Sequence, residues 1–499
     1  MMHKSTKLVA GSLPVLLLSL AGGLAARQQQ NPSSNLSAVT QSFVTVSAPV
    51  VVLRNVRVID GTGAPATENQ SIVIADGKIR SIGPASSVQV PAGAQEIDLA
   101  GHTVMPGLVG MHDHMFYPSP YGETGRIAGA PGSYNEMDVS FPRLYLANGV
   151  TTIRTTGTLE PYSDLQLKMA IDTGHIPGPE MYVTGPYLEG AGNPAMVQMH
   201  WLKGPEDATR TVDYWAYEGV HDFKAYMHIT RAELAAAVKA AHAHGLKITG
   251  HLCAVGFTEA ANIGIDDLEH GLPVDTEFDP GKEPDVCPGG MSAPTGPVIA
   301  ALDLESAPVQ KMMHTLIAKH VALTSTLPVF EPNRSTAPRI LDALSPQARF
   351  DFLQANSGRG RPGSAARAGQ SLAVFKKEEE FEHMFVKAGG TLLAGLDPTG
   401  YGGVIAGFGD QREVELLVQS GFTPLQAIHI ATENGANFLG VGNKIGALKP
   451  GMQADIIVVR GNPDQQIADI ENVETVFKDG IGYNSAKLIE SVKGQVGLH

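Results

Sequence analysis

The chain has 499 residues, a hydrophobic content of 43% and a formal net charge of −14 at pH 7. This length is enough for one large domain and a smaller one, and the acidic balance argues against nucleic acid or an anionic membrane as a partner. Its two cysteines, Cys253 and Cys287, are too few for a disulfide framework or a thiolate zinc site. One bridge between them and two free thiols are both open.

The first residues predict a secretion signal. Basic residues precede an apolar stretch that ends in small residues. Because Pro14 and several glycines interrupt that stretch, we favour a signal peptide over residues 1–26, cleaved near Ala25 or Ala26, and not an uncleaved anchor. Residues 27–48 are rich in Gln, Asn and Ser and are expected to form a disordered linker. No later segment is apolar enough to span a bilayer, so we expect a secreted or periplasmic protein without a stable membrane span after cleavage.

Short alternating strands follow the linker, and similar strands return near the C-terminus. An Asp-Gly pair at 76–77 and another at 479–480 predict hairpin turns between them. We therefore expect a small β-sandwich domain built from both chain ends, residues 49–105 and 441–499.

The middle of the chain alternates between strands and helices. Eight strand–helix units within about 300 residues favour a (β/α)8 TIM barrel over residues 106–440. The alternative is a doubly wound open sheet. The barrel is preferred because polar, metal-suited residues recur at strand C-terminal ends, where barrel active sites lie. The expected strands are 108–114, 151–155, 181–184, 222–226, 247–251, 267–270, 322–326 and 391–396.

A His-x-His pattern ends the first of these strands. Residues two apart on a strand point to the same face, so His112 and His114 are a candidate metal pair, whereas Asp113 points away. A second pair, His242 and His244, ends an Ala-rich segment that opens with a Thr-x-x-Glu capping box. On that helix, residues two apart lie on roughly opposite faces, which predicts a helix surface rather than a site.

Further polar residues lie at or near the predicted ends of later strands. Any single one of them is better explained as a hydrogen-bonded barrel residue. Six together, all towards C-terminal ends, are hard to explain by packing. The candidate ligands are His112, His114, Lys224, His251, His270 and Asp397.

The order His-x-His, Lys, His, His, Asp resembles that of the amidohydrolase superfamily. Residues 106–114 and 149–154 are similar to its first and second strands, and residues 447–456 to its return into the β domain. The similarity covers nearly the whole chain from about Val50. It is closest to the imidazolonepropionase-like and Xaa-Pro or Xaa-Arg dipeptidase-like group, which includes ochratoxin-hydrolysing amidohydrolases.

The resemblance implies a centre of two divalent metal ions. Zn²⁺ suits imidazole and carboxylate ligands best, with Mn²⁺, Co²⁺ or Ni²⁺ as alternatives. A buried lysine has a lowered pKa, so its neutral amine can add CO₂ and become a bridging carbamate. A register shift of one residue would instead turn Lys224 away from the barrel interior and leave one metal. The implied assignment is His112, His114 and Asp397 to one ion, His251 and His270 to the other, and carboxylated Lys224 to both.

The implied reaction is hydrolysis of an amide bond by a metal-bridging hydroxide. The expected substrate is a small molecule: a dipeptide, a C-terminal residue or an N-acyl amino acid. Asp397 would carry the proton from the nucleophile to the leaving nitrogen. Tyr226, on the same strand face as Lys224, is a candidate for oxyanion stabilisation and equally for packing at the rim. His228 is a candidate substrate contact.

Two other functions are considered. One is a cyclic amide, lactone or amidine hydrolase with one or two metals, and the other is an inactive amidohydrolase-fold binding protein. The resemblance also implies a homo-oligomer. Long loops after the strands are expected to set specificity, and the arginines among them either meet a substrate carboxylate or form a solvated surface. The loops are 272–297, 328–369 and the one after the third strand, and their notable residues are Tyr187, Glu189, Asn193, Cys287, Arg334, Arg359, Arg361 and Arg367.

Overall fold

The structure is a computed structural model, and the part of the chain that it describes is interrupted by short gaps. The described residues are 32–118, 134–192, 198–288, 296–332, 334–357, 364–399 and 403–497. The predicted signal peptide, Asn193, Arg359 and Arg361 lie outside these residues, and the side chain of Arg367 does too. Within the described ranges, we find no helix with the length and apolarity needed to cross a membrane.

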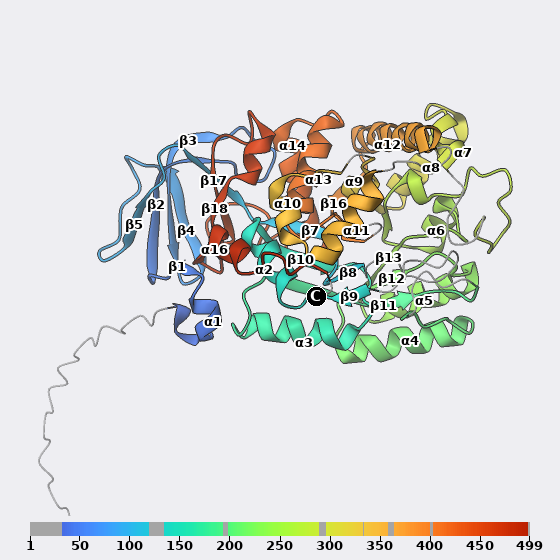
Figure 1. The fold of residues 1–499 in the computed structure, drawn as a ribbon, viewed down its shortest axis with the longest axis horizontal. Coiled ribbons are helices and arrows are strands. Elements are labelled where there is room, and N and C mark those ends of the chain that lie inside the picture. Colours follow the sequence, from blue (N-terminus) through green and yellow to red (C-terminus); the bar gives the residue numbers. More distant parts are fainter. Residues whose placement is uncertain are drawn as a thin grey trace, which may run out of the picture. The chain divides into compact units, whose positions relative to one another are not determined.

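Both ends of the chain build one nine-stranded, mostly antiparallel sheet. Blue N-terminal strands such as β2 and β3 lie in the same part of the molecule as the red C-terminal strands β17 and β18 in Figure 1. The two sets are joined where β6 pairs with β17. Along the sheet the order is β1 (Val44–Val46), β19 (Ile481–Asn484), β18 (Val473–Lys478), β17 (Ile456–Arg460), β6 (His102–Pro106), β2 (Val50–Val58), β3 (Thr67–Ala75) and β4 (Lys78–Pro84), while β5 (Gln95–Asp98) also pairs with β2.

This sheet differs in two respects from the predicted β domain. It is one continuous sheet that curls around its own core, since Val46 from one edge strand packs in the same apolar cluster as Ile79 from the other. The expected disordered linker is wrong for its second half, where residues 38–46 form helix α1 (Ala38–Gln41) and β1. The physical reason is that β1 pairs with β19 and buries Phe43, an apolar anchor within a polar stretch.

Eight parallel strands form the barrel, in sequence order around it. All eight predicted strands are present, and the TIM barrel is confirmed. The open-sheet alternative is wrong because the last strand returns to the first: the Asp397 backbone N–H donates to the His112 carbonyl at 2.9 Å. Gly395 permits this approach, since a Cβ there would overlap the His112 backbone. The strands are β7 (Leu108–Asp113), β10 (Val150–Thr155), β11 (Glu180–Leu188), β12 (Asp222–Ala225), β13 (Lys247–Gly250), β14 (Asp267–Glu269), β15 (Ala322–Ser325) and β16 (Leu392–Ala394).

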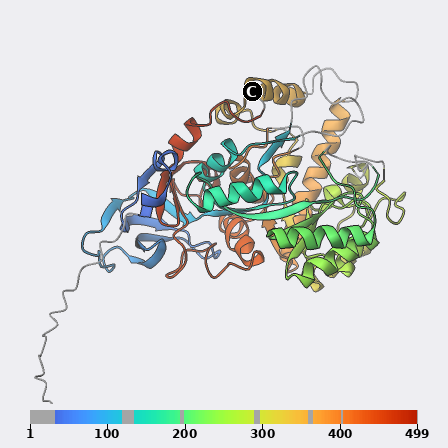
Figure 2. The same ribbon diagram turned by 90° about the horizontal axis from the view of Figure 1, so that it is seen from below.

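Helices surround these strands, as Figures 1 and 2 show. The longer ones are α2 (Ser140–Ala147), α3 (Pro161–Asp172), α4 (Pro205–Glu218), α5 (Arg231–Ala243), α6 (Phe257–Ile263), α8 (Ala307–Ala318), α11 (Pro346–Ser357), α12 (Ser364–Lys387) and α13 (Phe408–Gln419). Shorter ones are α7 (Gly296–Ala301), α9 (Leu327–Phe330), α10 (Pro338–Ala343), α14 (Pro424–His429), α15 (Gly435–Phe438) and α16 (Ser485–Glu490). A hairpin of β8 (Phe116–Pro118) and β9 (Tyr134–Glu136), 3-10 turns at 32–35, 272–274 and 467–471, and a π turn at 430–434 complete the fold.

The second His-x-His lies on a helix, as predicted. Helix α5 opens with the Thr230–Glu233 capping box, and His244 is its C-terminal cap. His242 Nε2 lies 3.0 Å from an Asp266 carboxylate oxygen, and His244 Nε2 lies 2.8 Å from one of Asp213, on the exposed side of the helix. These imidazoles belong to the surface and not to the metal site.

Candidate metal centre

The six predicted ligands meet at the C-terminal ends of the barrel strands. His112 and Lys224 lie within β7 and β12, and the other four follow the ends of β7, β13, β14 and β16. His270 and Asp397 have positive φ values of 70° and 51°, a conformation that non-glycine residues rarely adopt and that gathers at functional sites. The backbone thus turns at these two positions to direct their side chains to the centre.

Asp397 lies among three imidazoles. Its Oδ1 is 3.6 Å from His114 Nε2, and its Oδ2 is 3.9 Å from the Nε2 atoms of both His112 and His270. One ligand atom from each of His112, His114 and Asp397 lies within 4.8 Å of the others, so this buried trio could hold a metal ion. The trio is the same as the one that the resemblance assigned to the first ion.

Lys224 points into the barrel, in the register that the binuclear assignment requires. Its Nζ lies 3.2 Å from His112 Nε2, and the residue is 1% exposed. Burial lowers the pKa of Lys224 to about 8, which increases the fraction of neutral amine available for reaction with CO₂.

Burial lowers the pKa of all four histidines, and the positive charge of Lys224 adds to this effect. The pKa of His251 falls to about 3. The imidazoles are therefore neutral at pH 7, which is the form that binds a metal.

A second layer of hydrogen bonds orients three of the imidazoles. The Nδ1 atom of His112 lies 2.6 Å from Glu269 Oε2, that of His270 lies 2.7 Å from Thr326 Oγ1, and that of His114 lies 3.0 Å from the Gly157 carbonyl. Each contact leaves Nε2 to face the centre. His270 Nε2 is buried without a hydrogen-bond partner among the described residues, as expected of an atom that awaits a metal.

Sequence reasoning missed Glu269 and the group that compensates its charge. Buried Arg154 donates from Nη2 to Glu269 Oε1 at 3.0 Å and to Asp267 Oδ2 at 2.7 Å. Asp267 and Glu269 are two apart on a buried strand and so share a face. The signal that could have revealed this network was the presence of charged residues in otherwise apolar barrel strands. Asp113, predicted to point away from the ligands, is buried, and burial together with the negative charge of Asp410 raises the pKa of its carboxyl.

Asp397 is a candidate ligand whose pKa is also raised by burial. Burial raises its pKa to about 6, while the positive charge of Lys224, the hydrogen bond from Thr399 and, more weakly, the charge of Arg334 oppose the rise. Thr399 Oγ1 donates to Asp397 Oδ1 at 2.7 Å. Arg334, which also donates to the Val329 carbonyl, is thus within electrostatic reach of the centre.

Tyr226 borders the metal centre. Its ring centroid lies 4.9 Å from that of His251 and 4.8 Å from that of Tyr187. It belongs to a buried apolar cluster with Phe116, whose ring stacks on His114 at 4.3 Å. The position fits either of its predicted roles.

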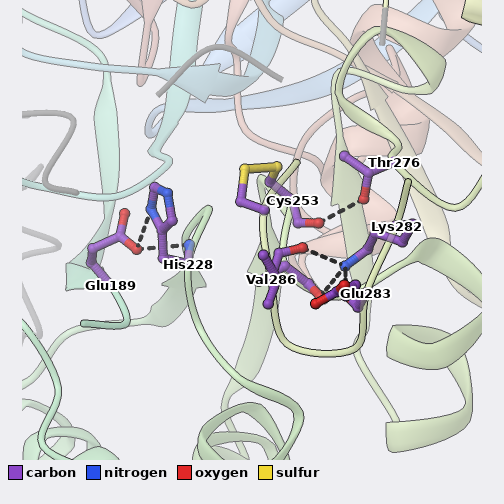
Figure 3. Close-up of a disulfide and its surroundings, with 9 residues drawn as sticks. Glu189, His228, Cys253, Thr276, Lys282, Glu283 and Val286 are labelled. Carbon is purple, nitrogen blue, oxygen red and sulfur yellow. Dashed lines mark hydrogen bonds and ion pairs between the residues drawn. A yellow bond between two sulfur atoms is a disulfide. The ribbon is translucent and has the colours of Figure 1, made fainter. Parts of the chain in front are cut away.

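His228 lies beside Glu189 at the rim (Figure 3). Its backbone N–H donates to Glu189 Oε1 at 2.7 Å, and its Nδ1 lies 3.2 Å from the same oxygen. A contact between His228 and substrate remains a prediction.

The two cysteines form a disulfide, which resolves the alternatives left open above (Figure 3). Cys253 follows His251 by two residues, so the bridge ties the loop after β14 to the end of β13. Within that loop, Lys282 Nζ donates to the carbonyls of Glu283 and Val286 at 3.0 and 2.8 Å. The loop that contains Cys287 is thereby held beside the centre.

Comparisons with known proteins agree with this geometry. Residues 402–482 match the model of the amidohydrolase family. An 88-residue segment is 35% identical to adenine deaminase 4 of Rhizobium meliloti (strain 1021), and covers 16% of this chain but only 15% of that protein.

Two solved structures share the fold over most of the chain. A Xaa-Pro dipeptidase with bound methionine in its active site has 22% identity and a TM-score of 0.63, with 87% of this chain and 100% of that one covered. Ochratoxinase from A. niger has 19% identity and a TM-score of 0.62, with 88% and 96% covered. The chain thus matches the amidohydrolase family over residues 402–482 and shares the fold of these two structures over most of its length.

Proposed function

We propose that the protein is a hydrolase that cleaves an amide bond in a small molecule with the help of two divalent metal ions, Zn²⁺ in the first instance. The convergence of four neutral imidazoles, Asp397 and Lys224 at the mouth of the barrel carries this proposal. We take the substrate to be a dipeptide, a peptide with a cleavable C-terminal residue or an N-acyl amino acid, as the resemblance implies.

The residues present fit two metal ions. His112, His114 and Asp397 would hold one, His251 and His270 the other, and Lys224 carboxylated on Nζ would contact both. Oriented Nε2 atoms and the unpartnered His270 Nε2 support this assignment. Bound divalent ions would lower the pKa of water and polarise the scissile carbonyl.

Asp397 is the residue suited to move a proton. A carboxylate whose pKa is raised to about 6 can accept a proton from the attacking water and return it to the leaving nitrogen near neutral pH. The hydrogen bond from Thr399 to Oδ1 fixes its orientation. Tyr226, whose ring lies beside that of His251, is the side chain that we propose to stabilise the developing oxyanion.

The proposed cellular location is outside the cytoplasm. The disulfide between Cys253 and Cys287 supports it, because such bonds persist in oxidising compartments. An N-terminus near Ala25 in protein recovered from the native host would agree with the predicted signal cleavage, whereas recovery of the intact N-terminus from the cytoplasm would contradict it.

A hydrolysis screen tests the function. The metal-loaded protein is assayed on Xaa-Pro, Xaa-Arg and hydrophobic dipeptides, N-acyl amino acids and cyclic amides, alongside metal analysis. We expect Asp397→Asn to lose about 10²- to 10⁴-fold in kcat, as for a general acid–base, and Lys224→Ala to lose metal as well as activity. His242→Ala, on the surface of α5, is the matched control and should behave as wild type.

Two results would overturn the proposal. One is fewer than about one metal ion bound per two chains after reconstitution, together with no hydrolysis of any amide. The other is full activity of Lys224→Ala with a single metal bound, which would remove the bridging role of this lysine.

A further inference from the structure

A cavity lies beside the candidate metal centre and has no part in the chemistry above. Its volume is about 520 Å³, within the usual range of small-molecule sites. Its walls come from the loop after β10, the end of β11, the segment 198–200 and one side of α4. In Figure 1, α3 and α4 lie near one another at this part of the barrel, and the Tyr162 ring of α3 contacts the Trp215 ring of α4.

Several tyrosine and tryptophan rings line this cavity. The Tyr162 and Trp215 ring centroids are 4.8 Å apart, and those of Tyr214 and Trp215 are 5.2 Å apart in a T-shaped arrangement. The Tyr162 and Tyr214 hydroxyls bond to one another, and each side chain remains 48% exposed. Tyr187 completes the inner wall. Clustered, partly exposed rings of this kind favour binding of another flat ring.

The buried charged group of the lining, Asp207, is already paired. Asp207 forms an ion pair with Arg210 and accepts hydrogen bonds from the Lys203 backbone N–H at 3.0 Å and from His200 Nε2 at 3.3 Å. Glu160, at the edge, is exposed to solvent. The cavity therefore has no unbalanced buried charge that would select an ionic ligand.

Two buried polar atoms of the lining lack partners. Thr158 Oγ1 and Gln198 Oε1 make no hydrogen bond within the described part of the chain. Gln198 Nε2 donates to the Tyr134 carbonyl at 2.9 Å, which fixes the amide and leaves its oxygen as an acceptor. Because buried polar groups are normally satisfied, a ligand that brings an N–H or O–H donor would complete this wall.

The cavity is separated from the metal centre by one aromatic ring. Tyr187, on its inner wall, has its ring centroid 4.8 Å from that of Tyr226 and 6.4 Å from that of His114. The ring packs on Gly157, where an added Cβ would lie 2.6 Å from Tyr187 Cε1. The Gly157 carbonyl in turn contacts His114 Nδ1. A ligand in the cavity would thus adjoin the residues that position a metal ligand.

We propose that this cavity binds an aromatic ring that carries a hydrogen-bond donor, namely an aromatic amino acid or an aromatic residue at one end of an amide. The ring would stack among Tyr162, Tyr214 and Trp215, and the donor would bond Gln198 Oε1. Its identity as substrate or product rests on the proposed hydrolase function, whereas the binding itself does not.

Tryptophan fluorescence provides the test. The chain has two tryptophans, and only Trp215 lines the cavity. In a Trp201→Phe background, metal-free protein is titrated with N-acetyl-L-phenylalaninamide, with free L-phenylalanine and with N-acetyl-L-leucinamide. We expect saturable changes with the phenylalanine probes and at least about fivefold weaker binding of the leucine amide. A preference for the free amino acid would indicate product binding, and a preference for the amide would indicate the substrate end.

Variants localise the binding. Tyr214→Ala and Gln198→Leu should each weaken binding at least about fivefold. Tyr217→Ala is the matched control, because this residue lies on the same helix, is 87% exposed and is not part of the lining. The inference is wrong if no probe saturates up to about 10 mM, if Tyr217→Ala weakens binding as much as Tyr214→Ala does, or if binding requires bound metal. Amide hydrolysis without cavity binding refutes this inference alone, and cavity binding without hydrolysis refutes only the proposed function.

Discussion

The contact between Glu269 and His112 leads to the sharpest prediction. In the wild-type protein, His112 Nδ1 lies 2.6 Å from the Glu269 carboxylate. A Glu269→Gln substitution keeps the shape of the side chain and a carbonyl oxygen near Nδ1 but removes the negative charge. Charge-assisted hydrogen bonds contribute about 1.5–3 kcal/mol and neutral ones about 0.5–1.5 kcal/mol, so the expected loss is about 1–1.5 kcal/mol. This corresponds to about tenfold weaker metal binding, at the lower end of the 10- to 100-fold effects typical of such partners.

The assay is a competition titration with a chromophoric chelator, which resolves the two metal affinities of each variant. Glu269→Gln should lower mainly the affinity for the ion assigned to His112. Thr326→Val removes the partner of His270 Nδ1 and should lower mainly the affinity for the other ion. Circular dichroism and thermal unfolding of the metal-free proteins check that both variants fold. Unchanged metal affinities in folded Glu269→Gln would show that the carboxylate does not orient His112, and equal loss of both ions would contradict the separate assignment.

Three further predictions concern stability. Burial raises the pKa of Glu382 from 4.5 to about 8, so the neutral form of Glu382 stabilises the fold fully below pH 4.5, and this contribution is lost as the pH rises towards 8. Between pH 5 and pH 8, the free energy of unfolding of Glu382→Gln, measured in urea, should therefore rise by at least about 1.4 kcal/mol relative to that of wild type. Parallel pH profiles of the two proteins would contradict this. The disulfide closes a loop with a sequence separation of 34, so replacing Cys253 and Cys287 together by Ser should lower the free energy of unfolding by about 3–4 kcal/mol. An unchanged urea midpoint would contradict this. Gly395→Ala would place a Cβ against the His112 backbone. It should lower the free energy of unfolding by about 1–3 kcal/mol through overpacking and should also weaken metal binding. A variant with wild-type unfolding and metal content would show that the contact between the last and first strands can relax.

Local patterns in the sequence were enough to predict the barrel and its candidate ligands. Short apolar strands with helices between them fix which segments pair, because parallel strands require such crossovers. Once the strands are placed, their C-terminal ends must share one rim, and the six polar residues at those ends must meet there. The contrast between His112 in a strand and His242 in a helix needed only the two periodicities.

Other features depended on contacts between residues far apart in the chain. Glu269 meets His112 across 157 positions, and Arg154 meets Glu269 across 115, so no local pattern identifies these pairs. The positive φ of His270 also breaks the strand alternation on which the prediction relied.

By itself, the sequence determined the eight barrel strands, because these follow from periodicity, and the order of its polar residues at the strand ends carried the resemblance and the six candidate ligands. Only the tertiary structure decided that Lys224 faces His112, that Cys253 pairs with Cys287, that β1 (Val44–Val46) joins the sheet, and that a cavity with aromatic walls lies beside the centre. The reason is physical: side-chain register, disulfide geometry and cavity shape arise from packing between distant segments, and the free energy of that packing is not encoded in any one of them.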